Sequence, residues 1–135
     1  MYEEKQPATG LVIVYTGNGK GKTTAAFGLA VRAAGQGLRV CIIQFIKGAW
    51  QTGEAAALQA RFADRIELHV KGSGFTWAST PEEMRQAAAE GWQLAREKVL
   101  SDRYDLVILD ELTYLLHYGL LAEEELLDLL ARRPA

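Results

Sequence analysis

A glycine-rich stretch constrains this sequence more than any other feature. Residues 16–24 read TGNGKGKTT and separate a continuous apolar run, LVIVY at 11–15, from a helical pattern. Such a run is typical of a strand buried on both faces. Glycines let the backbone turn tightly and aim its N–H groups at an anion, and the following helix adds the positive end of its dipole. We therefore predict a phosphate-binding loop, although a plain glycine-rich turn with incidental lysines would have the same composition.

Positions within this loop carry distinct expected roles. Lys22 is expected to reach the terminal phosphates of a nucleotide, and the Thr23 hydroxyl to bind Mg²⁺. The strict pattern has glycine where this sequence has Thr16, but Gly17 and Gly19 keep the loop flexible. The predicted nucleotide-binding residues are Gly17, Asn18, Gly19, Lys20, Gly21, Lys22, Thr23 and Thr24.

Beyond the loop, apolar runs alternate with helical patterns. The sharpest helix start is Thr80-Pro81-Glu82-Glu83, which has the composition of a capping box with proline at the first helical position. Alternation with runs this continuous favours a parallel α/β sheet of about four strands. We expect one domain over residues 1–135, with 1–10 as a loose N-terminal arm. Strands are predicted at 11–15, 38–45, 66–70 and 106–109, and helices from Lys22 to Gly35 or Gly37, at about 54–62, from Pro81 through Val99, and at 112–118 and 122–132.

Composition excludes several classes of protein. Fifteen Lys and Arg against 17 Asp and Glu give a net charge of −2, which argues against a non-specific nucleic-acid binder. The single cysteine, Cys41, cannot form an internal disulfide, which fits a reducing cytoplasm. No apolar run approaches the ~20 residues of a membrane span, and residues 1–10 lack the apolar core of a signal peptide. We expect a cytoplasmic protein with neither a membrane nor a nucleic acid as partner.

A second site signal is Asp110-Glu111, directly after the apolar run LVIL. A carboxylate at the carboxyl end of a buried parallel strand lies where α/β proteins bind ligands, and one of this pair can hold Mg²⁺. The alternative is an acidic cap on the next helix.

Aromatic residues in expected loops give a third signal. Phe75 and Trp77 lie in the segment GSGFTW, where they can stack on a flat ligand or fold back onto the core. Lys47 can meet an anion or remain a solvated loop lysine. His69 and His117 have no partner at metal-ligand spacing in the sequence and are interpreted as structural, as is Cys41 in mid-strand.

Five segments together resemble one enzyme family. TGNGKGKTTAAFGLAVRAAGQG, QFIKGAW, GSGFTW, LVILDELTY and RRP resemble the P-loop type of ATP:corrinoid adenosyltransferase in order and spacing, over roughly residues 10–134. Thr16 is usual in that family. The resemblance implies a three-layer P-loop NTPase (RecA-like) fold with a mainly parallel sheet flanked by helices. The family continues with another strand after the RRP-like stretch, so we expect this chain to lack that C-terminal strand.

The resemblance also implies an activity and its partners. The family transfers the 5′-deoxyadenosyl group of ATP to the Co(I) of a reduced corrinoid (cobalamin or cobyrinic acid a,c-diamide), releasing triphosphate, in vitamin B12 biosynthesis or salvage. It implies a cytoplasmic homodimer that uses Mg²⁺ (or Mn²⁺) and receives electrons from a reduced flavoprotein. By position, Lys22 would act on the triphosphate charge, and Thr23 with Glu111, or the adjacent Asp110, would hold the metal. Phe75 and Trp77 would line the corrinoid side and help to remove the lower axial ligand.

Two other functions fit parts of the pattern. An ordinary P-loop ATPase would use Glu111 to activate water and would release ADP and phosphate. A non-catalytic nucleotide-binding module would place its aromatic loop on single-stranded nucleic acid, which the net charge of −2 disfavours.

Overall fold

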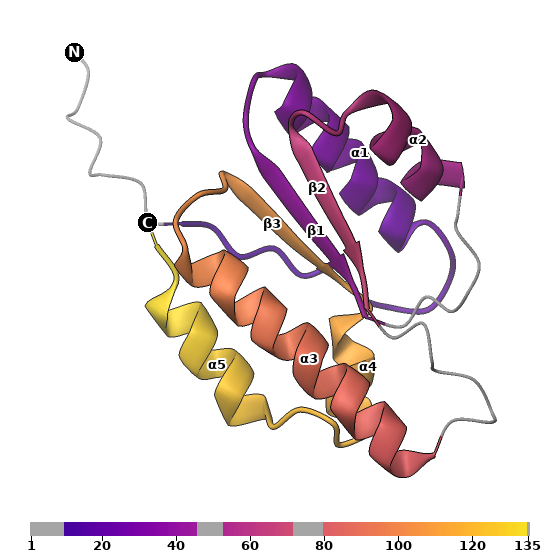
Figure 1. The fold of residues 1–135 in the computed structure, drawn as a ribbon, viewed down its shortest axis with the longest axis vertical. Coiled ribbons are helices and arrows are strands. Elements are labelled where there is room, and N and C mark those ends of the chain that lie inside the picture. Colours follow the sequence, from indigo (N-terminus) through magenta and orange to yellow (C-terminus); the bar gives the residue numbers. More distant parts are fainter. Residues whose placement is uncertain (1–9, 46–52, 72–79, 135) are drawn as a thin grey trace.

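A computed structural model describes residues 10–45, 53–71 and 80–134 of the chain. Three short strands alternate with five helices in this part (Figure 1). In chain order the elements are α1 (Lys22–Gly35), β1 (Val40–Gln44), α2 (Gly53–Arg61), β2 (Ile66–Val70), α3 (Pro81–Leu100), β3 (Leu106–Asp110), α4 (Leu112–His117) and α5 (Glu123–Arg132).

The three strands form one parallel sheet in the order β2-β1-β3. Every residue of the central strand β1 is buried, which explains why its sequence is apolar without alternation. In register, Val40 lies opposite Ile66 on one side and Leu106 on the other. All three strands therefore end at the same edge, where the functional residues gather.

Helices cover both faces of the sheet. α1 and α2 lie on one face, and α3, α4 and α5 lie on the other (Figure 1). Alternation along β1 separates two cores, because Val40 and Ile42 point toward α1 and α2 whereas Cys41 and Ile43 point toward α3. The predicted parallel α/β architecture with flanking helices is confirmed. In the described residues no helix is both long and apolar enough to cross a membrane.

Local signals place the helix ends where the sequence predicted them. At α3 the Glu83 N–H donates to Thr80 Oγ1, and the Thr80 N–H donates to Glu83 Oε2, both at 3.2 Å, so the capping box is confirmed. After α1, Gly37 has a φ of 79° and Leu38 donates its N–H to Ala33 O at 3.0 Å, which is a glycine-terminated helix end.

The predicted strand at residues 11–15 is wrong for this structure. No strand is assigned there, and exposure ranges from 41% at Val12 to 82% at Leu11. A buried parallel strand needs a hydrogen-bonded neighbour and apolar cover on both faces. The apolar run is suited to a buried position in a sheet, but its sequence does not specify which strand it would pair with. The sheet of the described residues accordingly has three strands rather than the expected four.

Candidate functional site

Three glycines give the phosphate-binding loop its shape. Gly17, Gly19 and Gly21 have φ values of 113°, 105° and 109°, a backbone region that residues with a Cβ rarely adopt. Gly21 is the N-cap of α1, and it offers no side-chain acceptor to the first turn. No acidic residue lies in that turn either. The loop and the start of α1 are exposed, so their N–H groups are available to an anion.

Lys22 folds its side chain across this loop. Its Nζ donates to Gly17 O at 2.7 Å and to Gly19 O at 2.8 Å. A lysine ammonium has three donors, so these two bonds position the charge over the loop and leave one donor for a phosphate oxygen. The sequence predicted the charge of Lys22 but not its bonds to the loop carbonyls.

Thr23, Asp110 and Gln44 meet at the carboxyl edge of the sheet. Thr23 Oγ1 in the first turn of α1 donates to Asp110 Oδ1 at 3.0 Å. Gln44 Nε2 donates to the other oxygen, Asp110 Oδ2, also at 3.0 Å. Asp110 and Gln44 are the last residues of neighbouring strands and are paired in register. The structure therefore holds both oxygens of one carboxylate in place beside the loop.

The Thr23–Asp110 pair offers two oxygen donors that can be compared with the needs of Mg²⁺. Mg²⁺ is octahedral with oxygen ligands at 2.0–2.1 Å, so adjacent ligand oxygens lie about 3.0 Å apart. The Oγ1–Oδ1 distance of 3.0 Å matches this separation. A hydroxyl and a carboxylate are also the oxygen donors that Mg²⁺ prefers. The two oxygens are thus spaced compatibly with the metal, provided that the Thr23 hydroxyl proton turns away from Asp110 when the metal binds.

Glu111, the next residue after Asp110, lies at the start of α4 rather than at the end of β3. It is the N-cap of α4 and has a φ of 64°, in the left-handed region. The sequence expectation coupled Thr23 with Glu111, whereas the hydrogen bond in the structure joins Thr23 to Asp110. Phe75, Trp77 and Lys47 lie outside the described residues, so the expectations for them have no structural counterpart here.

Gln44 was missed in the sequence analysis. It is 1% exposed and is the buried polar residue of a strand that is otherwise apolar. A buried polar side chain needs a hydrogen-bond partner, and here that partner is Asp110. A glutamine at the end of a buried strand next to the expected site was the signal that would have identified it.

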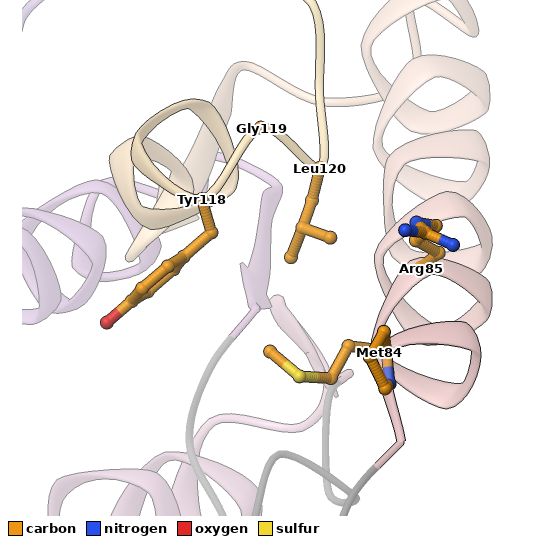
Figure 2. Close-up of a pocket in the computed structure, with 6 residues that line it drawn as sticks. Met84, Arg85, Tyr118, Gly119 and Leu120 are labelled. Atoms are coloured by element: carbon orange, nitrogen blue, oxygen red, sulfur yellow. The ribbon is translucent and has the colours of Figure 1, made fainter.

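The described residues enclose two shallow hollows on the surface. Figure 2 shows the one between α3, which carries Met84 and Arg85, and the turn after α4, which carries Tyr118 and Leu120. It measures about 240 Å³, and a second, lined by Tyr15 and residues of α1, about 330 Å³. Small-molecule sites usually enclose about 300–1,000 Å³. The described residues of the first hollow alone are too few to enclose a large macrocycle.

Comparison with known proteins identifies the family. The sequence profile of "ATP:corrinoid adenosyltransferase BtuR/CobO/CobP" matches residues 8–135. The chain belongs to this family. Over 132 residues it is 46% identical to the corrinoid adenosyltransferase of Escherichia coli K12 and 44% identical to that of Salmonella typhimurium, covering 97% of this chain and 66% of each relative. With that of Pseudomonas aeruginosa it shares 42% identity over 93% of this chain and 62% of the relative.

Away from the phosphate-binding loop, the structure of this ATP:corrinoid adenosyltransferase family member contains a polar cluster that the sequence analysis did not predict. Glu67 Oε2 accepts from Tyr104 Oη at 2.7 Å and from Lys98 Nζ at 2.9 Å, and it lies 2.8 Å from His69 Nε2. Cys41 Sγ lies 3.8 Å from the same oxygen. We call these five residues the Glu67 cluster.

The Glu67 cluster gives His69 and Cys41 a carboxylate neighbour that the sequence spacing did not reveal, while Cys41 is buried as expected of a core residue. Cys41 of β1 is paired in register with Glu67 of β2, and His69 follows two residues later on the same face. An E-x-H pattern on a strand was a visible signal. Cys41 lies next to Glu67 only because β1 and β2 pair in this register, and the sequence does not specify that pairing.

Burial and charge shift the pKa values of two groups in this cluster. Burial, aided by the negative charge of Glu67, raises the pKa of the Cys41 thiol to about 12. Partial burial by itself raises the pKa of Glu67, but the hydrogen bonds with His69, Lys98 and Tyr104 outweigh it and lower that pKa to about 2. Glu67 is therefore an anion at neutral pH and Cys41 a neutral thiol.

Proposed function

We propose that this chain binds ATP and transfers its 5′-deoxyadenosyl group to the Co(I) of a reduced corrinoid, releasing triphosphate. The observation that carries the proposal is the family match over residues 8–135, which includes the whole phosphate-binding loop. The chain spans about two thirds of the length of the relatives named above. The roles proposed below are therefore those of residues within this chain.

The loop would bind the triphosphate of ATP. Its glycines have positive φ values, the first turn of α1 has no side-chain cap, and the dipole of α1 adds positive potential at the same point. Lys22, already held by Gly17 and Gly19, would place its remaining donor on a phosphate oxygen. As triphosphate departs, the negative charge on it grows, and these fixed donors stabilise that charge.

Thr23 and Asp110 would hold Mg²⁺, with Gln44 orienting the carboxylate. The fit rests on the 3.0 Å separation of the two donor oxygens. When bound, the metal neutralises phosphate charge and favours departure of triphosphate. Glu111, next along the chain, would act from the start of α4 on a water or phosphate near this metal.

The chemistry requires positioning more than proton transfer. Co(I) of the substrate is a strong nucleophile that attacks the 5′ carbon of the ribose, and the C5′–O bond breaks with its electron pair leaving on triphosphate. No protein base is needed for this displacement. The contribution of the protein is to align nucleophile, carbon and leaving group in a site protected from water.

Phe75 and Trp77 would form the corrinoid side of the site. Their place in the chain supports this, because residues 72–79 connect the carboxyl end of β2 to the start of α3. Aromatic side chains can exclude water and displace the lower axial ligand of the corrinoid. Residues at the entrance of the hollow in Figure 2, between α3 and the turn after α4, would add to that surface.

We also propose a location, an oligomeric state and an electron donor for the chain. Family membership supports a single nucleotide-binding domain that acts as a cytoplasmic homodimer. It also supports a reduced flavoprotein as the source of electrons for Co(I). Sedimentation equilibrium of the purified chain tests the dimer separately from the activity.

An anaerobic assay tests the reaction. The chain is mixed with MgATP and chemically reduced cobalamin, and loss of Co(I) absorbance is followed together with the phosphate products. Adenosyl transfer predicts triphosphate in a one-to-one ratio with the Co(I) consumed. Release of ADP and phosphate would instead indicate an ATPase. Lys22→Ala is the matched control, because it removes the loop-held ammonium and should lower the rate at least ten-fold.

A further inference from the structure

The Glu67 cluster brings together three metal-ligand types that the proposed reaction does not use. Thiol, carboxylate and imidazole side chains are the ligands of zinc sites. Here the Sγ of Cys41, a carboxylate oxygen of Glu67 and a ring nitrogen of His69 lie within 4.8 Å of one another. They come from two neighbouring strands of one rigid sheet rather than from a loop.

We propose that Cys41, Glu67 and His69 form a binding site for one thiophilic divalent cation of the zinc type. The sulfur, the carboxylate oxygen and Nε2 of the imidazole are its three protein ligands. A water molecule from solvent completes a tetrahedral arrangement, as in other zinc sites with three protein ligands. The thiol proton leaves to the buffer when the metal binds.

Two of the three distances between ligand atoms are close to those of a filled site, and the third, between Cys41 Sγ and a ring nitrogen of His69, is within 4.8 Å. With Zn–S near 2.3 Å and Zn–N and Zn–O near 2.0–2.2 Å, ligand atoms in a tetrahedron lie about 3.3–3.7 Å apart. Cys41 Sγ and Glu67 Oε2 are 3.8 Å apart, and His69 Nε2 and Glu67 Oε2 are 2.8 Å apart. Opening the second distance by about half an ångström requires only a side-chain rotation of Glu67 or His69.

Exposure gives the metal a way in. The side chains of His69 and Glu67 are 29% and 39% exposed, while Cys41 lies beneath them with no exposed surface. The sulfur of Cys41 is thus the base of a site that opens to solvent through its other two ligands. β2 is an edge strand, so no further strand of the described sheet covers this opening.

Lys98 competes for the same carboxylate. Its Nζ lies 2.9 Å from Glu67 Oε2, where it neutralises the charge that a cation would otherwise use. Binding of a metal therefore displaces the ammonium toward solvent, and such a partly exposed ion pair contributes little to stability. Removing Lys98 should consequently tighten metal binding. If the cluster is only a structural set of hydrogen bonds, removing Lys98 should not create or increase affinity for a metal.

This site is separate from the proposed magnesium site. Cys41 points toward α3, whereas Gln44, three residues later on β1, lies on the face of Val40 and Ile42. The two sites thus lie on opposite faces of the sheet. Because Cys41 belongs to β1 and the other two ligands to β2, a bound cation would join the central strand to the edge strand.

Cobalt(II) substitution tests the proposal directly. The reduced chain is titrated with Co²⁺ in the presence of excess Mg²⁺, and the thiolate-to-cobalt charge-transfer band is recorded in the near ultraviolet. Since Cys41 is the single cysteine of the sequence, any such band reports this residue. We expect a band that saturates at one cobalt per chain, tetrahedral d–d bands in the visible, and loss of both on addition of Zn²⁺.

Variants distinguish a three-ligand site from a lone thiol. Glu67→Gln and His69→Gln should each weaken cobalt binding at least ten-fold, in line with the loss of one ligand. Lys98→Gln should tighten it, and His117→Gln, which changes the second histidine of the sequence, should leave it unchanged. Zn²⁺ should raise the melting temperature of the unsubstituted chain but not of Cys41→Ser.

Three results would overturn the site. One is absence of the charge-transfer band at saturating Co²⁺ on the folded chain. Another is a band of unchanged affinity in both Glu67→Gln and His69→Gln. The third is saturation at one cobalt per two chains, which would indicate a metal bridging two molecules. Circular dichroism of each variant confirms that it is folded, and the result with the unsubstituted chain does not depend on any variant.

Discussion

At the scale of single residues, Asp110 and Glu111 are adjacent in sequence but occupy different environments. Asp110 ends β3 with one oxygen on Thr23 and the other on Gln44. Glu111 begins α4 in a left-handed conformation. Magnesium prefers ligands that are already spaced for an octahedron, and the Thr23–Asp110 pair has that spacing. We therefore predict that Asp110, rather than Glu111, is the direct ligand of the proposed Mg²⁺.

Neutralising each carboxylate in turn checks this assignment. Asp110→Asn keeps an acceptor for Thr23 but removes the charge, so the Mg²⁺ concentration for half-maximal adenosyl transfer should rise roughly ten-fold or more. Glu111→Gln should raise it less. Asp128→Asn, in a surface ion pair with Arg132 on α5, is the control and should not change it. A larger effect from Glu111→Gln than from Asp110→Asn would contradict the assignment.

At the scale of elements, two glycines of opposite character belong to α1. Gly37 terminates the helix with a φ of 79°, where a Cβ costs about 1–2 kcal/mol. Gly28 is inside the helix, exposed, and a Cβ there would meet nothing within 4 Å. Urea unfolding should show Gly37→Ala destabilised by about 1 kcal/mol and Gly28→Ala stabilised by up to about 1 kcal/mol. Equal effects of the two substitutions would contradict the role of Gly37 in terminating α1.

The contrast between predicted and observed elements has a physical origin. Helix ends depend on a few consecutive residues, such as Thr80 and Glu83, and the sequence contains all of them. The exposed segment 11–15 shows the opposite case, because an apolar run cannot specify the strand edge that would receive it. The same limit applies to sites: the loop around Lys22 is local and was predictable, whereas the meeting of Cys41 with Glu67 depends on strand register.

Gln44 was absent from the predicted site for a related reason. Its sequence neighbours are apolar, so it was interpreted only as part of a buried run. Its partner, Asp110, lies 66 residues away in the chain and becomes adjacent when β1 and β3 pair. Residues that orient another side chain across strands are therefore the part of such a site that sequence patterns alone identify least well.

At the scale of the whole molecule, the sheet divides the interior into two cores that share β1. Ile42 belongs to the core under α1 and α2, and Ile43 to the core under α3 and α5; neither has any exposed surface. Side chains on opposite faces of a strand share no packing partners. Substitutions have additive effects on the free energy of unfolding when they share no packing partners and are coupled when one backbone shift moves both, so the adjacent pair Ile42 and Ile43 tests which case applies.

Valine substitutions measure whether the two cores are independent. Ile42→Val and Ile43→Val should each lower the free energy of unfolding by about 0.5–1.5 kcal/mol, and the double variant should lose the sum within about 0.5 kcal/mol. Urea denaturation followed by both fluorescence and circular dichroism supplies the three values, with coincident transitions as the test of two-state unfolding. A deficit well beyond the sum would mean that the central strand shifts as a unit, so that packing on the α3 face affects the Thr23–Asp110–Gln44 edge of the sheet through β1. Additivity would instead mean that this edge and the Glu67 cluster are mechanically separate, each supported by its own helical layer.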